Sequence, residues 1–103
     1  MKIAIGREGS SEPLFFATAL ALPKVDLEGL TWELEMPAAL IADYPEFILT
    51  ALLSVGNLWA PLESWAVAHL NPGANLLRMP LPGLHEQSLN LASVIRLVLR
   101  DPA

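Results

Sequence analysis

The sequence contains no cysteine, and this absence excludes several kinds of chemistry at once. Without thiols the chain can hold no disulfide, no thiolate metal site and no cysteine nucleophile. Small secreted domains usually depend on disulfides, so we expect a cytoplasmic protein. Glutamine occurs once and asparagine four times, an economy of thermolabile residues that is typical of heat-adapted proteins.

Charged residues are also scarce, and basic ones are the scarcest. Lysine and arginine total 6 against 11 aspartates and glutamates, which gives a net charge of −5. Nucleic-acid binding depends largely on basic side chains that neutralise phosphates, so we expect no nucleic-acid partner. The same balance argues against docking on anionic lipid through a basic patch.

Apolar residues, in contrast, make up 53% of the chain, while charged residues make up 17% against a usual ~25%. A chain of 103 residues has room for one core, so we expect a single domain spanning residues 1–103. Its apolar surface exceeds what one copy can cover, which predicts a homo-oligomer, a dimer or higher. The predicted oligomer interface is the aromatic and leucine-rich central region, although an ordinary core would explain the same residues: Phe47, Leu58, Trp59, Leu62 and Trp65.

The same central region raises the question of a membrane segment. Phe47–Leu62 is an uncharged run of sixteen residues, but it contains a glycine, an asparagine and a proline. A membrane-spanning helix needs ~20 predominantly apolar residues, so we expect a buried helical hairpin and no membrane partner. The polar stretch 7–12 interrupts any signal-peptide pattern near the start. A membrane-associated hairpin over 47–77 stays the alternative.

Three segments are predicted to be extended. Residues 30–36 alternate apolar and polar side chains, the pattern of a half-buried strand, and residues 2–6 do so more briefly. Residues 75–79 are predicted to form a short extended piece.

Helices are predicted where proline can occupy a first turn or where apolar residues follow helical spacing. Their ranges are 14–22, 37–43, 45–55, 58–70 and from residue 86 onward. Residues 95–100 could be helix or strand. Together, the predicted strands and helices indicate an α+β or small α/β domain with about three strands and four to five helices.

The loop Gly6–Ser11 is a candidate anion site. It is predicted to lie between a strand and a helix, where backbone N–H groups and a helix N-terminus can collect a phosphate or carboxylate. Arg7, Ser10 and Ser11 would be its donors. A plain glycine-containing turn is the alternative, since glycine and serine are ordinary loop residues.

Other titratable residues carry less information. His69 and His85 lack ligand-spaced partners, so no metal site is predicted, although His85 lies in a loop where it could touch a ligand. Glu63, the only formal charge between residues 47 and 77, is either a buried functional carboxylate or a solvent-facing residue of an amphipathic helix. Glu33 and Glu35 share a strand face, which could suit a cation or could simply be solvated.

The segment Arg78-Met79-Pro80-Leu81-Pro82-Gly83, followed by Gln87-Ser88-Leu89-Asn90-Leu91-Ala92, resembles the C-terminal pattern of SPOUT-class RNA 2′-O-methyltransferases. The resemblance implies a knotted α/β fold that binds S-adenosylmethionine. The residues that it places in the cofactor pocket are Met79, Gly83, Ser88, Leu89 and Asn90. From the residues alone, this segment is a Pro-Gly turn followed by a helix capped by Ser88 or Asn90.

The sequence therefore favours a non-enzymatic, self-associating module that binds a protein or a small molecule, with no catalytic residue and no cofactor assigned. A small transferase that binds a nucleotide or S-adenosylmethionine is the alternative. The candidate ligand-binding residues are Arg7, Ser10, Ser11, Gly83, His85, Ser88 and Asn90.

Overall fold

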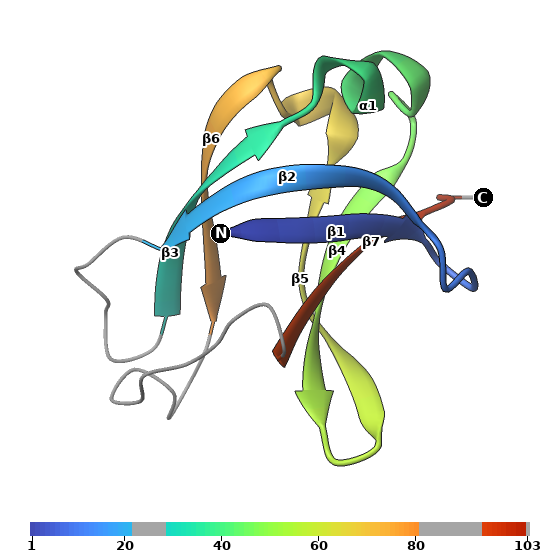
Figure 1. Ribbon diagram of the computed structural model, residues 1–103, viewed down its shortest axis with the longest axis vertical. Coiled ribbons are helices and arrows are strands. Elements are labelled where there is room, and N and C mark those ends of the chain that lie inside the picture. Colours follow the sequence, from blue (N-terminus) through green and yellow to red (C-terminus); the bar gives the residue numbers. More distant parts are fainter. Residues whose placement is uncertain (22–28, 81–93, 103) are drawn as a thin grey trace.

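A computed structural model describes residues 1–21, 29–80 and 94–102. These residues form seven strands in one sheet that curls into a half-barrel (Figure 1). The strands are β1 (Lys2–Arg7), β2 (Pro13–Ala21), β3 (Gly29–Met36), β4 (Ile48–Val55), β5 (Leu58–Ala66), β6 (Gly73–Pro80) and β7 (Ile95–Arg100). One short helix, α1 (Ala38–Asp43), lies at the top of Figure 1, and a 3₁₀ turn, η1 (Val67–His69), joins β5 to β6.

The strands lie side by side in the order β5-β4-β7-β1-β2-β3-β6. Every neighbouring pair is antiparallel except β1 and β7, which are parallel. β5 and β6 are therefore the two edges of the sheet. Because the sheet curls, these edges approach each other and line a common groove.

The predicted fold class is wrong: the chain is mostly β, and the described residues contain one α-helix instead of four or five. Three segments that were predicted as helices, 14–22, 45–55 and 58–70, form most of β2, β4 and β5. In β2 the small residues Ala17 and Ala19 face the core, while the large residues Phe16 and Leu20 face outward. Both faces of this strand are largely apolar, so the sequence does not show the alternation of polar and apolar residues that usually identifies a strand.

The two wrongly predicted helices over 45–55 and 58–70 correspond to one β-hairpin. Gly56 and Asn57 form the two-residue turn between β4 and β5, and Val55 pairs with Leu58 across it. Gly56 has a φ of +60°, which suits the first central position of a type II′ turn. The sequence analysis predicted two helices, over 45–55 and 58–70, on either side of these two residues. Pro61 is tolerated within β5 because this strand is an edge and its pairing is irregular beside that residue.

Several local predictions are confirmed. The strands over 2–6 and 30–36 and the short helix after Pro37 are present, and the extended piece 75–79 is part of β6. Residues 95–100 adopt the strand alternative. The helix predicted from residue 86 onward is therefore wrong over 95–100, and its part over 86–93 lies outside the described residues. Among the described residues, no helix is long and apolar enough to cross a membrane.

The core fills the concave side of the sheet. Its largest fully buried side chains are Ile5, Leu34, Leu40, Leu49, Met79, Leu97, Leu99 and Val67. Leu40 of α1 belongs to this cluster, so the helix contributes to the core at one end of the half-barrel.

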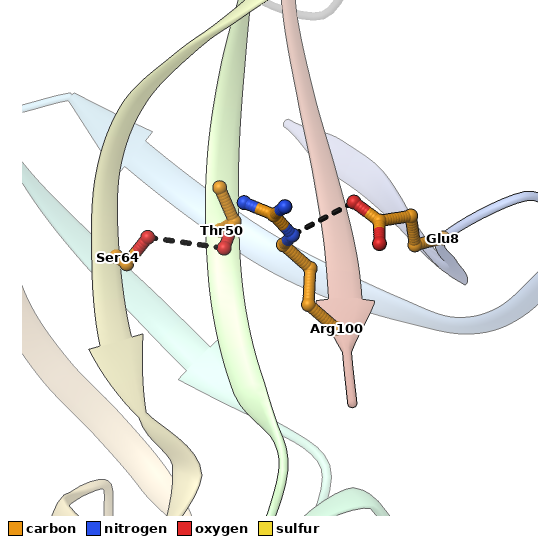
Figure 2. A network of polar contacts seen from close by, with 4 residues as sticks. All are labelled: Glu8, Thr50, Ser64 and Arg100. Atoms are coloured by element: carbon orange, nitrogen blue, oxygen red, sulfur yellow. Dashed lines mark hydrogen bonds and ion pairs between the residues drawn. The ribbon is translucent and has the colours of Figure 1, made fainter. Parts of the chain in front are cut away.

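Two side-chain contacts lie at the outer side of the sheet, one between two strands and one between a strand and a loop (Figure 2). Thr50 on β4 and Ser64 on β5 share a hydrogen bond of 3.0 Å between their hydroxyl oxygens. Arg100 on β7 pairs with the carboxylate of Glu8, with 2.7 Å between Nε and Oε2. Glu8 also donates its backbone N–H to the carbonyl of Leu99, so the start of the β1–β2 loop is held against the end of β7.

A third polar cluster shapes the turn before β6. The side-chain amide of Asn75 donates to the carbonyl oxygens of Asn71 and Gly73, at 2.8 and 3.0 Å. Its side-chain oxygen accepts the N–H of Asn71 at 2.9 Å. Asn75 is buried, so these bonds satisfy a polar group that water cannot reach freely.

Candidate functional site

The outer face of β2 carries an exposed apolar row in the middle of the sheet. Leu14, Phe16 and Leu20 are 43%, 59% and 57% exposed. Phe16 lies opposite Ala4 of β1, whose small side chain leaves the phenyl ring uncovered on that side. We call these three residues the β2 patch. Large apolar side chains gathered on one exposed face are typical of a contact surface.

Opposite charges flank the β2 patch on its two sides. Thr18 faces outward from β2 between Phe16 and Leu20. It pairs with Lys2 on β1 and with Glu35 on β3, so the three residues form one row across three strands. All three are exposed. A lysine therefore stands on the β1 side of the row and a glutamate on the β3 side.

A shallow hollow of about 220 Å³ lies beside Phe16 on the same face. Its lining comes from β1, β2, the end of β3 and the start of β6: Lys2, Phe16, Thr18, Glu35, Met36, Pro37 and Gly73. The outer face thus offers a projecting aromatic ring next to a depression, which is a shape that a second surface can fill.

The predicted anion loop lies elsewhere on the sheet and lacks its helix. The segment after residue 12 is β2, so no helix N-terminus follows the loop. Ser10 and Ser11 do line a pocket of about 180 Å³, but Arg7 does not. The guanidinium of Arg7 lies 5.5 Å from the centroid of the Phe47 ring instead. The cationic residue that lines this pocket is Arg96 of β7.

The five residues of the predicted oligomer interface do not share one surface. Phe47, Leu62 and Trp65 are half-buried and pack against the core. Trp59 lies under the guanidinium of Arg96, and Leu58, 74% exposed, stands at the tip of the β4–β5 hairpin.

The remaining titratable candidates are exposed. Glu63 projects from the edge strand β5, and its carboxylate accepts the N–H of Ser64 at 3.0 Å. His69 is exposed in η1, and Glu33 and Glu35 are exposed on the outer face of β3. The part of the chain that the structure describes contains no group of three or more histidines, aspartates or glutamates able to hold a metal ion.

The residues implied by the methyltransferase resemblance are placed only in part. Met79 is buried in the core on β6. Gly83, His85, Ser88, Leu89 and Asn90 lie outside the described residues. The mostly antiparallel sheet also differs from the knotted α/β fold that the resemblance implies.

The sequence interpretation missed the β2 patch because it assigned that segment to a helix. One signal was available: Leu14, Phe16, Thr18 and Leu20 are spaced two apart and alternate with smaller residues at 17 and 19. Arg96 lies in the segment 95–100, which the sequence left open between helix and strand, so no local signal placed it beside the β1–β2 loop. No protein-family model matches the chain, and comparison with curated proteins and with solved structures found no match either.

Proposed function

We propose that the chain is a non-catalytic interaction module that acts as a homodimer, with two copies joined face to face through β2. The observation that carries this proposal is the β2 patch, three large apolar side chains exposed in the middle of a seven-stranded sheet. Burying such a patch against another apolar surface is favourable by about 25 cal/mol per Å² of apolar area. The proposal moves the predicted self-association from the central region of the chain to β2.

The charges beside the patch support a second copy as the partner. A two-fold axis parallel to β2 and lying between two facing sheets exchanges the β1 side of one copy with the β3 side of the other. It therefore places Lys2 of one subunit over Glu35 of its partner, and the same contact forms twice. A self-complementary surface of this kind is what an isologous dimer requires. Complementary charges also fix the register of the contact.

The shape of the face supports the same arrangement. The hollow beside Phe16 lies toward β3, where Pro37 and Gly73 border it. In the two-fold arrangement the two phenyl rings meet at the axis, with the hollow of one subunit on each side of the pair. Aromatic side chains at the centre of an interface are frequent energetic centres of protein interfaces.

The expected dimer is weak because the face is curved. The sheet curls, so its outer side is convex and contact is confined to β2 and its neighbours (Figure 1). Interfaces that bury less than about 1,200 Å² in total are typical of transient complexes. We expect a dissociation constant in the micromolar range, which corresponds to about −8 kcal/mol.

Sedimentation velocity over protein concentrations of about 1 to 200 μM tests the proposal. The wild type should shift with concentration from the 11.2 kDa chain toward twice that mass. Phe16→Ser should keep the protein monomeric throughout. Leu58→Ser is the matched control, because Leu58 is also highly exposed but stands at a hairpin tip away from β2. A wild type that stays monomeric, or equal losses in both variants, would refute the proposal.

A charge exchange tests the register of the dimer. Lys2→Glu and Glu35→Lys should each weaken association by placing like charges together twice. The double variant restores opposite charges and should recover association close to the wild-type value. Circular dichroism of each variant establishes that the fold is intact. If the double variant associates no better than the single ones, the two-fold arrangement along β2 is wrong.

A further inference from the structure

The edge strand β6 carries backbone groups that no neighbouring strand uses. The N–H of Ala19 donates to the carbonyl of Met1 at 2.7 Å, which shows which residues of β2 bond to β1 and which bond to β3. Counting from that bond through the registers of β2, β3 and β6 directs the N–H and C=O groups of Ala74 and Leu76 away from the sheet. Pro80 falls in the same alternation, so its missing N–H removes no bond to β3. Among the described residues, no strand and no side chain bonds to these groups of Ala74 and Leu76.

The opposite edge, β5, is less open to a further strand. The N–H of Val67 donates to the carbonyl of Phe47 at 3.0 Å, and the same counting directs the backbone groups of Ser64 and Ala66 away from β4. The N–H of Ser64 is already used, because it donates to the carboxylate of Glu63 at 3.0 Å. Charged residues at an edge commonly hinder strand pairing. A further strand therefore pairs more readily with β6 than with β5.

A groove of about 610 Å³ lies between the two edges. All four residues whose backbone groups point outward, two on each edge strand, line this groove. Its inner wall is apolar and comprises Trp65, Leu70 and Leu77. The groove thus combines unpaired main-chain donors and acceptors with an apolar wall, which is what an extended peptide with apolar side chains on one face requires.

The charges around the groove are mostly negative. Glu33 and Glu35 are exposed on the outer face of β3, the strand beside β6, and the carboxylate of Glu63 lies at the edge of β5. Strands in a sheet are about 4.8 Å apart, so a strand added to β6 runs about 10 Å from β3, within reach of a lysine side chain. Arg78 of β6 is basic, but its guanidinium lies against Gly29, at the other end of β3 from Glu35. The surroundings therefore favour a basic partner.

We infer that the free edge of β6 binds an extended segment of a partner protein in which lysines alternate with apolar residues. The segment adds an antiparallel strand to the sheet. Its lysines lie opposite Ala74 and Leu76, bond to them through the backbone, and direct their side chains outward toward Glu33 and Glu35. The intervening apolar side chains point to the inner wall of the groove. Main-chain bonds supply affinity in this mode of recognition, and the alternating side chains supply specificity. This inference does not depend on the β2 dimer.

A capped pentapeptide of three lysines alternating with two valines tests the inference in an NMR titration of the full chain. The amide resonances of Ala74 and Leu76 should shift saturably, and their hydrogen exchange should slow at least about tenfold, because both N–H groups become bonded. The peptide with glutamate in place of each lysine should bind at least about tenfold more weakly, since like charges then face each other. The lysine peptide N-methylated at its central lysine lacks a backbone donor toward β6 and should not bind.

Variants of the edge assign the contact to β6. Leu76→Pro removes an N–H that bonds to no strand, so the fold should be retained, as circular dichroism can establish, but peptide binding should be lost. Leu76→Val is the matched control, because it keeps the N–H and should bind as the wild type does. Glu33→Gln should weaken binding about two- to fivefold, the usual range for an exposed ion pair. If Leu76→Pro does not fold, the N-methylated peptide still tests the backbone contact on the wild type.

The same titration separates this inference from the β2 dimer. Phe16→Ser, which removes the proposed dimer contact, should bind the lysine peptide as the wild type does. The inference is overturned if the lysine peptide gives no saturable shift at Ala74 and Leu76, or if the glutamate or N-methylated peptide binds equally well. It is also overturned if Leu76→Pro abolishes self-association while Phe16→Ser does not, because a second copy of the chain then occupies this edge.

Discussion

Replacing Trp32 by phenylalanine should cost the fold little, although Trp32 is 2% exposed on the concave side of β3. Its indole nitrogen is buried and has no hydrogen-bond partner among the residues that the structure describes. A buried donor that loses its hydrogen bond to water costs about 1 to 3 kcal/mol. Phenylalanine retains an aromatic ring in the core and removes this donor.

The two effects of the change nearly cancel. Removing the unpartnered N–H group recovers about 1 to 3 kcal/mol. Phenylalanine has three fewer heavy atoms than tryptophan, the nitrogen and two carbons, and the lost burial of the two carbons costs about 0.8 kcal/mol each, about 1.6 kcal/mol together. The free energy of unfolding should therefore change by no more than about 1.5 kcal/mol. Trp32→Ala leaves a large cavity and should cost about 3 to 5 kcal/mol.

Urea unfolding followed by far-UV circular dichroism measures both variants, because tryptophan fluorescence changes with the substitution itself. With a slope of about 2 kcal/mol per molar urea, Trp32→Phe should move the midpoint by less than about 0.8 M. Trp32→Ala should lower it by about 2 M. Leu34→Ala, on the same strand and the same buried face, calibrates the cost of a purely apolar cavity. A phenylalanine variant as unstable as the alanine variant would show that the indole nitrogen stabilises the fold, which contradicts the reasoning.

Three smaller changes test other parts of the sheet. Asn75→Asp removes two donations to backbone carbonyls and should cost about 2 to 3 kcal/mol at neutral pH. Those carbonyl oxygens raise the folded-state pKa of the new carboxyl above its unfolded value of about 3.9. Part of the lost stability should therefore return below about pH 4 and be lost again as the pH rises. Urea unfolding below about pH 4 and at neutral pH measures this difference. Gly56→Ala meets no atom within 4 Å but forces alanine to a φ of +60°, so thermal unfolding should show a loss of about 1 kcal/mol, or about 4 to 8 °C. Thr50→Val should change stability by less than about 1 kcal/mol, because Ser64, its hydrogen-bond partner, is exposed and can bond to water.

The predicted oligomer interface shows what a compositional argument leaves open. The excess of apolar residues predicts self-association, and this stays a prediction. The residues first chosen for it, such as Trp65 and Phe47, pack against the core. Phe16 is exposed instead because its neighbours in the sequence, Phe15 and Ala17, face the opposite side of β2. Composition counts apolar residues, but only the strand direction separates the inner ones from the outer ones.

The sequence predicted an anion site at the loop 6–11 from local signals, and this role stays a prediction. Ser10 and Ser11 line a pocket there. The basic residue that lines the same pocket is Arg96, about ninety residues further along the chain, which lies there because β7 pairs in parallel with β1. A contact between segments so distant in sequence has no local signature.

The cytoplasmic location stays a prediction as well.

The sequence by itself determined the elements that have one polar face and one apolar face. Residues 30–36 alternate so clearly that β3 was predicted within one residue, and Pro37 correctly preceded the short helix. The tertiary structure decided the rest, because β2, β4 and β5 are apolar on both faces and their local sequence fits a helix equally well. For these segments, pairing with neighbouring strands and the side on which the core forms decided the conformation. The same pairing aligned Lys2, Thr18 and Glu35 across three strands, and no local propensity specifies such a register.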